Sequence, residues 1–171
     1  AQARNGSGVV TGFKKIKIYT LAHIGSGLLS LPEQEMHTTA FWLHFPKSFF
    51  EDFASFSTTE IEDSIHGLGN ILKTVGTVLL LSDPHDLAVA ALDESHEIRN
   101  VVLYDNYPGG IGQSDPLFRR REELIAAALD LAAACPCEAG CPSCVGPHTE
   151  IGPRCQEGAM RTLRNVTTYS E

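Results

Sequence analysis

The sequence predicts an α/β fold class, with α+β as the close alternative: a small mixed sheet flanked by helices and followed by a C-terminal four-cysteine loop. Short segments of alternating apolar residues predict the strands, and one long segment with apolar residues at steps of three and four predicts an amphipathic helix. All five cysteines lie between residues 135 and 155. The length of 171 residues suffices for one domain with a sizeable core.

The domain is predicted to span residues 9–171, after a flexible leader over residues 1–8. The leader lacks the apolar stretch of a signal peptide. The chain begins without an initiator Met, so we expect a fragment of a larger protein. The sequence contains no apolar run of about 18 residues, so we expect no membrane span and a cytoplasmic protein.

The first half of the domain is predicted to contain two strands and a short helix. Val9–Thr20 is predicted as a strand, and Gly25–Gly27 as a turn. Thr38–Phe45 is predicted as an interior strand covered on both sides, because apolar side chains fall on both of its faces. Pro46 is expected to end it and to open a short helix that carries three phenylalanines.

A long helix from about residue 58 to residue 80 is the clearest element. Ser57 and Glu60 have the spacing of a capping box at its start. Its apolar stripe consists of Ile61, Ile65, Leu68, Leu72, Val75 and Leu79. Gly67, Gly69 and Gly76 interrupt the helix at a cost of about 1 kcal/mol each against Ala, which predicts close packing against a neighbour.

The second half is predicted to contain two short strands, a glycine-rich loop and two helices. Leu87–Leu92 and Val101–Tyr104 are the predicted strands. The second strand leads into a glycine loop over residues 109–112, which suits either a tight turn or a phosphate site. A helix over residues 114–134 follows, and a last helix runs from about Cys155 to Val166.

The cysteines between the last two helices have the spacing C-x-C-x₃-C-x₂-C, formed by Cys135, Cys137, Cys141 and Cys144. Zn²⁺ takes four such ligands in a tetrahedron, and an all-thiolate site is closed and structural. Cys155 or His148 remains open as a substitute for one ligand. Two alternatives are a thiol redox pair at Cys141 and Cys144 and a cysteine-rich helix end without metal.

The formal charge of −8 is typical of a poor stand-alone nucleic-acid binder. Contact with DNA or with a partner domain would therefore need a local basic patch. The candidates are Lys14, Lys15, Lys17, Arg119, Arg120 and Arg121. The alternative for the three arginines is a solvated helix face.

The string Tyr104-Asp105-x-x-Pro108-Gly109-Gly110-Ile111-Gly112, then a helix, then the cysteine motif, resembles the C-terminal zinc-binding domain of MrfA-type superfamily-2 DNA helicases. Gly12-Phe13-Lys14-Lys15-Ile16, Leu31-Pro32-Glu33 and Thr39–Leu43 are similar to the same family. The resemblance covers roughly residues 9–168.

The resemblance implies an accessory domain that follows an ATP-hydrolysing DEAD/DEAH-type motor in a helicase for DNA repair. It implies Zn²⁺ on Cys135, Cys137, Cys141 and Cys144, packing on the motor and help in guiding single-stranded DNA. The chain lacks the motor, so we expect no ATPase activity in the fragment itself. A stand-alone zinc-binding interaction module of a DNA-handling or anti-phage complex is the alternative.

Overall fold

The computed structural model describes residues 2–8, 12–16, 23–28, 34–94, 98–146 and 151–169. The strands are β1 (Gln2–Gly8), β2 (Gly12–Ile16), β3 (His23–Leu28), β4 (Gln34–Pro46), β5 (Leu87–Glu94) and β6 (Ile98–Asp105). The helices are η1 (Lys47–Phe53, 3₁₀), α1 (Thr58–Leu80), α2 (Ser114–Arg119), α3 (Arg121–Ala134) and α5 (Cys155–Tyr169). Within these residues, no helix is both long and apolar enough to cross a bilayer.

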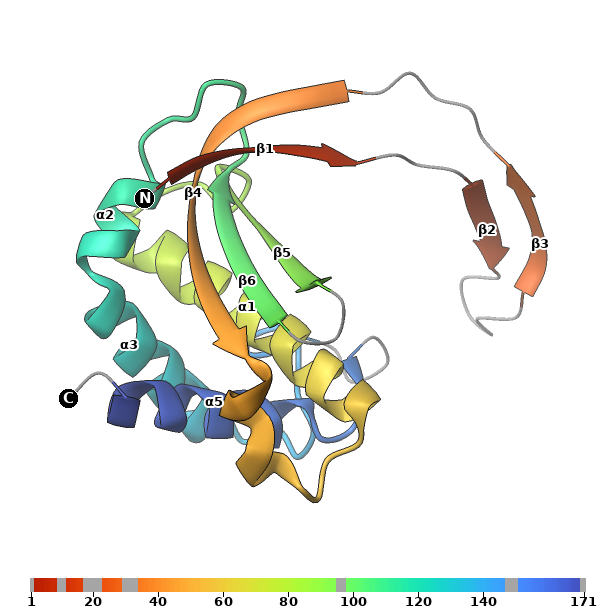
Figure 1. Cartoon of the computed structure of the whole chain (residues 1–171), viewed down its shortest axis with the longest axis vertical. Helices are drawn as coiled ribbons and strands as arrows, with labels where there is room; N and C mark the ends of the chain where they lie inside the picture. The colour runs from red at the N-terminus through yellow and green to blue at the C-terminus, as the bar shows by residue number, and fades with distance from the viewer. Residues whose placement is uncertain are drawn as a thin grey trace.

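The strands form a four-stranded sheet in the order β1-β4-β6-β5 and a separate pair, β2-β3. Each ladder is antiparallel, so the architecture is the α+β variant of the predicted class, without the mixed strand directions that we expected. Helices flank the sheet, and the cysteine loop lies near the C-terminus, as predicted. The β2-β3 pair, which we call the arm, lies apart from the four-stranded sheet and the helices (Figure 1).

The N-terminal segment differs from the prediction. Residues 1–8 were expected to form a flexible leader, but Gln2–Gly8 forms β1 and pairs with Gln34–Ala40 of β4. Strand pairing uses backbone groups, which even a segment rich in Gly and Ser supplies. Of the strand predicted over Val9–Thr20, the structure describes Gly12–Ile16, and the Gly25–Gly27 turn lies inside β3.

Helix α1 begins as its sequence predicts. The backbone N–H of Glu60 donates to Ser57 Oγ at 3.2 Å, and the N–H of Ser57 donates to Glu60 Oε2 at 2.7 Å. This reciprocal pair is a capping box, which satisfies two backbone donors at the helix start. The helix ends at Leu81, whose φ of 52° is left-handed.

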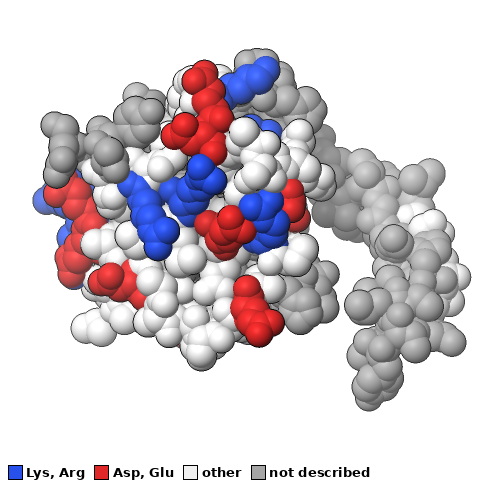
Figure 2. Space-filling model, turned by 90° about the horizontal axis from the view of Figure 1, so that it is seen from below, with Lys and Arg blue, Asp and Glu red and all other residues white. Residues whose placement is uncertain are grey.

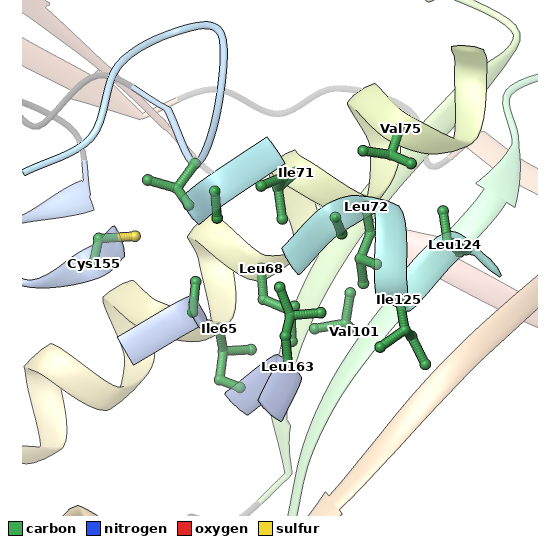
Figure 3. Packing of buried hydrophobic residues seen from close by; sticks show 14 of the residues in the cluster. Ile65, Leu68, Ile71, Leu72, Val75, Val101, Leu124, Ile125, Cys155 and Leu163 are labelled. Atoms are coloured by element: carbon green, nitrogen blue, oxygen red, sulfur yellow. The ribbon is translucent and has the colours of Figure 1, made fainter. Parts of the chain in front are cut away.

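The core lies where α1, α3 and α5 meet one face of the sheet (Figure 3). Leu68, Ile71 and Leu72 of α1 are fully buried there. The close packing predicted for the helix glycines is confirmed. A Cβ on Gly67 would overlap Cys155 Sγ, and a Cβ on Gly69 would lie 2.9 Å from Val89 Cγ2. Helix α1 thus approaches both the sheet and α5 closely.

The helix predicted over residues 114–134 is broken at Arg120 into α2 and α3. Arg120 has φ −101° and ψ 22°, and its backbone N–H donates to Pro116 O at 3.0 Å. Its guanidinium donates to Leu79 O at 2.7 Å and to both carboxylate oxygens of Glu123. These contacts join the break to the end of α1.

Candidate metal centre

The four cysteines of the C-x-C-x₃-C-x₂-C motif come together directly after α3. Their Sγ atoms all lie within 4.8 Å of one another. The Sγ–Sγ distances are 3.3 Å for Cys135–Cys137, 3.6 Å for Cys135–Cys141, 3.5 Å for Cys137–Cys144 and 3.6 Å for Cys141–Cys144. A tetrahedral Zn²⁺ with bonds near 2.3 Å has sulfur edges of about 3.8 Å. These four distances are slightly shorter than the edges of that tetrahedron, so the size of the cluster suits a zinc ion.

Two turns bring the sulfurs together. The N–H groups of Cys144 and Gly146 both donate to Cys141 O at 3.0 Å, which folds the Cys141–Cys144 segment back on itself. Gly140 has φ +123°, and a Cβ there would lie 2.8 Å from Val145 Cγ2. A side chain at this position is both strained and crowded, so the loop requires glycine.

Neighbouring helices hold the loop in place. Asn70 of α1 donates from Nδ2 to Val145 O at 3.0 Å. Gln156 of α5 donates from Nε2 to Ala132 O at 2.9 Å, and its Oε1 lies 3.2 Å from Cys137 Sγ. Because Val145 and Cys144 are buried in the main core, the cluster is continuous with that core.

The chemistry of the donors also fits a metal. Burial and the neighbouring Cys135 and Cys144 sulfurs raise the pKa of the Cys137 thiol to about 12. The backbone N–H of Ser143 and the neighbouring sulfurs lower the pKa of the Cys141 thiol to about 7. One thiolate forms readily, whereas further ones at this separation repel it. A divalent cation removes this repulsion, which is why thiolate clusters bind one.

Cys155 and His148 were the two residues that could have replaced one of the four ligands, and the structure describes only the first. Cys155 lies outside the cluster: it is 1% exposed, and its thiol donates to Asp63 O at 3.1 Å. Burial raises the pKa of this thiol to about 12, so it remains protonated. It is a buried small residue at the start of α5. His148 lies outside the described residues.

The glycine loop encloses a carboxylate of its own chain. Asp105, fully buried at the end of β6, accepts hydrogen bonds from the backbone N–H groups of Ile111, Gly112, Gln113 and Ser114 at 2.7–3.1 Å. The hydroxyl groups of Ser114 and Thr39 lie 2.8 and 3.0 Å from the carboxylate. Gly109, Gly110 and Gly112 have φ of +85°, +76° and +87°. Tyr104, half-buried, precedes the loop.

The glycine loop was predicted to be either a tight turn or a phosphate site, and this arrangement favours the tight turn. Burial alone would raise the pKa of Asp105, but the hydrogen bonds from Ser114, Ile111, Gln113 and Gly112 outweigh it and hold the pKa below its ordinary value. The donors that would bind a phosphate are occupied. Sequence reasoning missed this role, although an acidic residue nine positions before a helix start was a visible signal.

The three arginine candidates form ion pairs with acidic side chains of α2 and α3. Arg119 pairs with Asp115 at 2.9 Å, Arg120 with Glu123 at 2.7 Å and Arg121 with Glu122 at 3.4 Å. Lys14 and Lys15 lie in β2, and Lys17 lies outside the described residues. On the face seen from below, Lys and Arg are interspersed with Asp and Glu and form no uniform basic patch (Figure 2). Among the candidates whose side chains are described, the three arginines are each paired with an acidic residue.

Known proteins match this chain along nearly its whole length. The MrfA Zn-binding domain family (MZB) matches residues 68–145. An uncharacterized ATP-dependent helicase, YprA, from Bacillus subtilis (strain 168) is 38% identical over 123 residues, which are 71% of this chain and 16% of the relative.

Two crystal structures of the DUF1998 helicase MrfA match the fold. The DNA-bound structure has a TM-score of 0.71 and 33% identity over 96% of this chain and 22% of that one. The structure with DNA and AMPPNP has a TM-score of 0.66 and 32% identity over 95% and 21%. The chain thus spans about a fifth of these helicases. Residues 68–145, slightly less than half of the chain, are thus similar to the MrfA Zn-binding domain family.

Proposed function

We propose that the chain is a structural zinc-binding accessory domain of an ATP-dependent DNA helicase, with Cys135, Cys137, Cys141 and Cys144 as the four ligands. The observation that carries the proposal is the convergence of the four sulfurs within 4.8 Å in the region that matches the MrfA Zn-binding domain. A reducing compartment, the cytoplasm, keeps such thiolates available for metal.

The zinc has a structural role in this proposal. Four thiolates fill a tetrahedron and leave no position for water or substrate. The bound ion supplies only a fixed crosslink within the loop that follows α3, from Cys135 to Cys144. The redox alternative at Cys141 and Cys144 leaves Cys135 and Cys137 without a function, although their sulfurs lie 3.6 and 3.5 Å from those two.

A pair of matched substitutions tests the ligand set. Cys141→Ser should lower the zinc content and the melting temperature together, because it removes one ligand. Cys155→Ser makes the same chemical change at a buried cysteine outside the cluster and should retain one zinc per chain. Elemental analysis and thermal unfolding of the reduced protein give both values. Full zinc retention in Cys141→Ser would remove this residue from the ligand set.

We further propose that the domain packs on the motor of its parent helicase, which acts in DNA repair, and helps to guide single-stranded DNA. Charge supports DNA contact by the N-terminal region. Residues 1–32 contain four of the 13 Lys and Arg residues and no Asp or Glu, whereas all 21 acidic residues follow. The arm belongs to this basic segment, so it attracts phosphates that the acidic body repels.

Binding of a fluorescent single strand to the full-length helicase tests the DNA contact. Lys14→Gln with Lys15→Gln should weaken binding and reduce the salt slope by about 0.7 per lost phosphate contact. Arg119→Gln with Arg121→Gln removes the same charge from residues that are paired with acidic side chains, and it should change the slope less. If the arginine substitutions change the salt slope more than the lysine substitutions do, the DNA contact lies at the arginines and not at the arm.

A further inference from the structure

The four-stranded sheet has two apolar faces, of which only one packs on the helices. On the inner face, Phe41, Phe45, Val101, Leu103 and Leu87 are at most 3% exposed. Their contacts include Phe118 of α2 and the glycines of α1. The apolar residues of this face are therefore accounted for by their packing in the core.

The residues between them point to the opposite face, because side chains alternate along a strand. Trp42, Val102, Tyr104 and Ala90 are only half-buried, and Leu92 is 47% exposed. The apolar residues that pack against the core do not include Trp42, Val102, Ala90 or Leu92. The prediction that β4 is covered on both sides is therefore wrong for the described chain.

The outward residues form a continuous surface. Trp42 lies opposite Val102 and Val102 lies opposite Ala90, so one apolar row crosses three strands. Ala40, which is itself only 5% exposed, Tyr104 and Ala88 form the next row. We call these two rows, together with Leu92, the open face. A contiguous apolar surface of this kind marks an interaction site on a soluble protein.

We propose that the open face docks against another part of the parent helicase polypeptide, outside residues 1–171. This inference rests on the proposed function and names the surface that faces the motor. The helicase relatives supply the occupant, because the chain matches only 22% of the MrfA chain and the remainder of that polypeptide lies beyond the match. An apolar segment of that remainder would complete the missing layer.

The chemistry of the open face favours a protein partner over DNA. The two rows of the open face and Leu92 contain no Lys or Arg, and the one cation that the register puts on this side of the sheet, Arg4 of β1 opposite Thr38, lies beyond the second row. Aromatic residues in a face that excludes charge are typical of the centre of a protein interface. His44 and Asn100, whose Nδ1 and Oδ1 lie 3.0 Å apart, form a polar border at one end.

Hydroxyl-radical footprinting read by mass spectrometry tests the proposal residue by residue. Oxidation of Trp42 and Tyr104 should fall several-fold in the full-length helicase relative to the 171-residue chain. Tyr107 is 45% exposed on the glycine loop and serves as the control, whose oxidation should stay within twofold. Equal oxidation of Trp42 in both proteins would overturn the proposal.

Two further readouts separate the alternatives. If the isolated chain sediments as a dimer and Trp42 is protected at the same concentrations, a second copy occupies the open face and the proposal fails. Val102→Glu should lower the melting temperature of the full-length helicase more than Val78→Glu, the same change at a 67% exposed position of α1. If Val102→Glu fails to fold, Leu92→Glu at the exposed border replaces it and should also lower the melting temperature more than Val78→Glu does; equal shifts would contradict the proposal. Because footprinting reads burial alone, its failure would leave the zinc proposal standing.

Discussion

The close packing of α1 against α5 makes Gly67 sensitive to the addition of a single methyl group. In Gly67→Ala the new Cβ would overlap Cys155 Sγ and would lie 3.0 Å from Val145 Cβ. Cys155 is 1% exposed and Val145 is fully buried, so neither can move into solvent. Ala should therefore destabilise the fold, although it is the better helix former.

The magnitude follows from two opposing terms. Overpacking in a well-packed core costs about 1–3 kcal/mol. Ala in place of Gly inside a helix returns about 1 kcal/mol. We expect Gly67→Ala to lower the free energy of unfolding by up to about 2 kcal/mol. Each kcal/mol corresponds to a fall in melting temperature of about 2–4 °C.

A double-mutant cycle isolates the contact. Cys155→Ala removes the sulfur that the new methyl group would overlap, so the double variant should be more stable than the sum of the two single effects by at least about 1 kcal/mol. Urea unfolding of the four zinc-loaded proteins gives the coupling energy. Additive effects would refute the steric reasoning, as would a Gly67→Ala variant more stable than the parent sequence.

Three further predictions concern the buried carboxylate, the helix cap and the metal. Asp105→Asn should destabilise the fold by about 2–4 kcal/mol, because several donors lose a charged acceptor. A carboxyl group whose pKa is lower in the folded state stabilises the fold above its unfolded pKa, near 3.8, and loses this contribution as the pH falls through the folded pKa. The difference in the free energy of unfolding between Asp105→Asn and the parent sequence should thus be constant above about pH 5 and become smaller on acidification. A difference that stays constant down to about pH 3 would contradict this reasoning. Ser57→Ala should cost about 1 kcal/mol in urea unfolding, and Ser48→Ala, at an exposed serine, should change little; equal effects would exclude the capping box. Removal of zinc with a strong chelator should raise hydrogen exchange first over residues 135–146, and unchanged exchange there would contradict a structural metal.

Local signals made α1 and the cysteine cluster predictable. The capping box of Ser57 and Glu60 and the apolar stripe lie within one segment. The spacing of residues in that segment is therefore enough to predict the helix and its buried face. The C-x-C-x₃-C-x₂-C spacing likewise needs only short turns to bring its sulfurs together. The glycines of α1 predicted close packing, although the partner at Gly67, Cys155, lies far along the chain and carries no local signal.

Features that depend on distant backbone or tertiary contacts were not predictable. Gln2–Gly8 has no strand pattern of its own and becomes a strand because β4 offers a free edge. The break at Arg120 depends on Leu79 O, which α1 places there. The enclosure of Asp105 depends on a glycine loop whose conformation no single residue specifies. Each case is a long-range contact that overrides local preference.

The position of β1 at one side of the sheet has a practical consequence for the preparation of this protein. Without residues 1–8, the Gln34–Ala40 segment of β4 would present a row of bare N–H and C=O groups, and such a row is a template for a strand from another molecule. Samples trimmed at the N-terminus by proteolysis should therefore oligomerise more readily on concentration than intact ones. Affinity tags are better attached at the other terminus, where the chain leaves a helix.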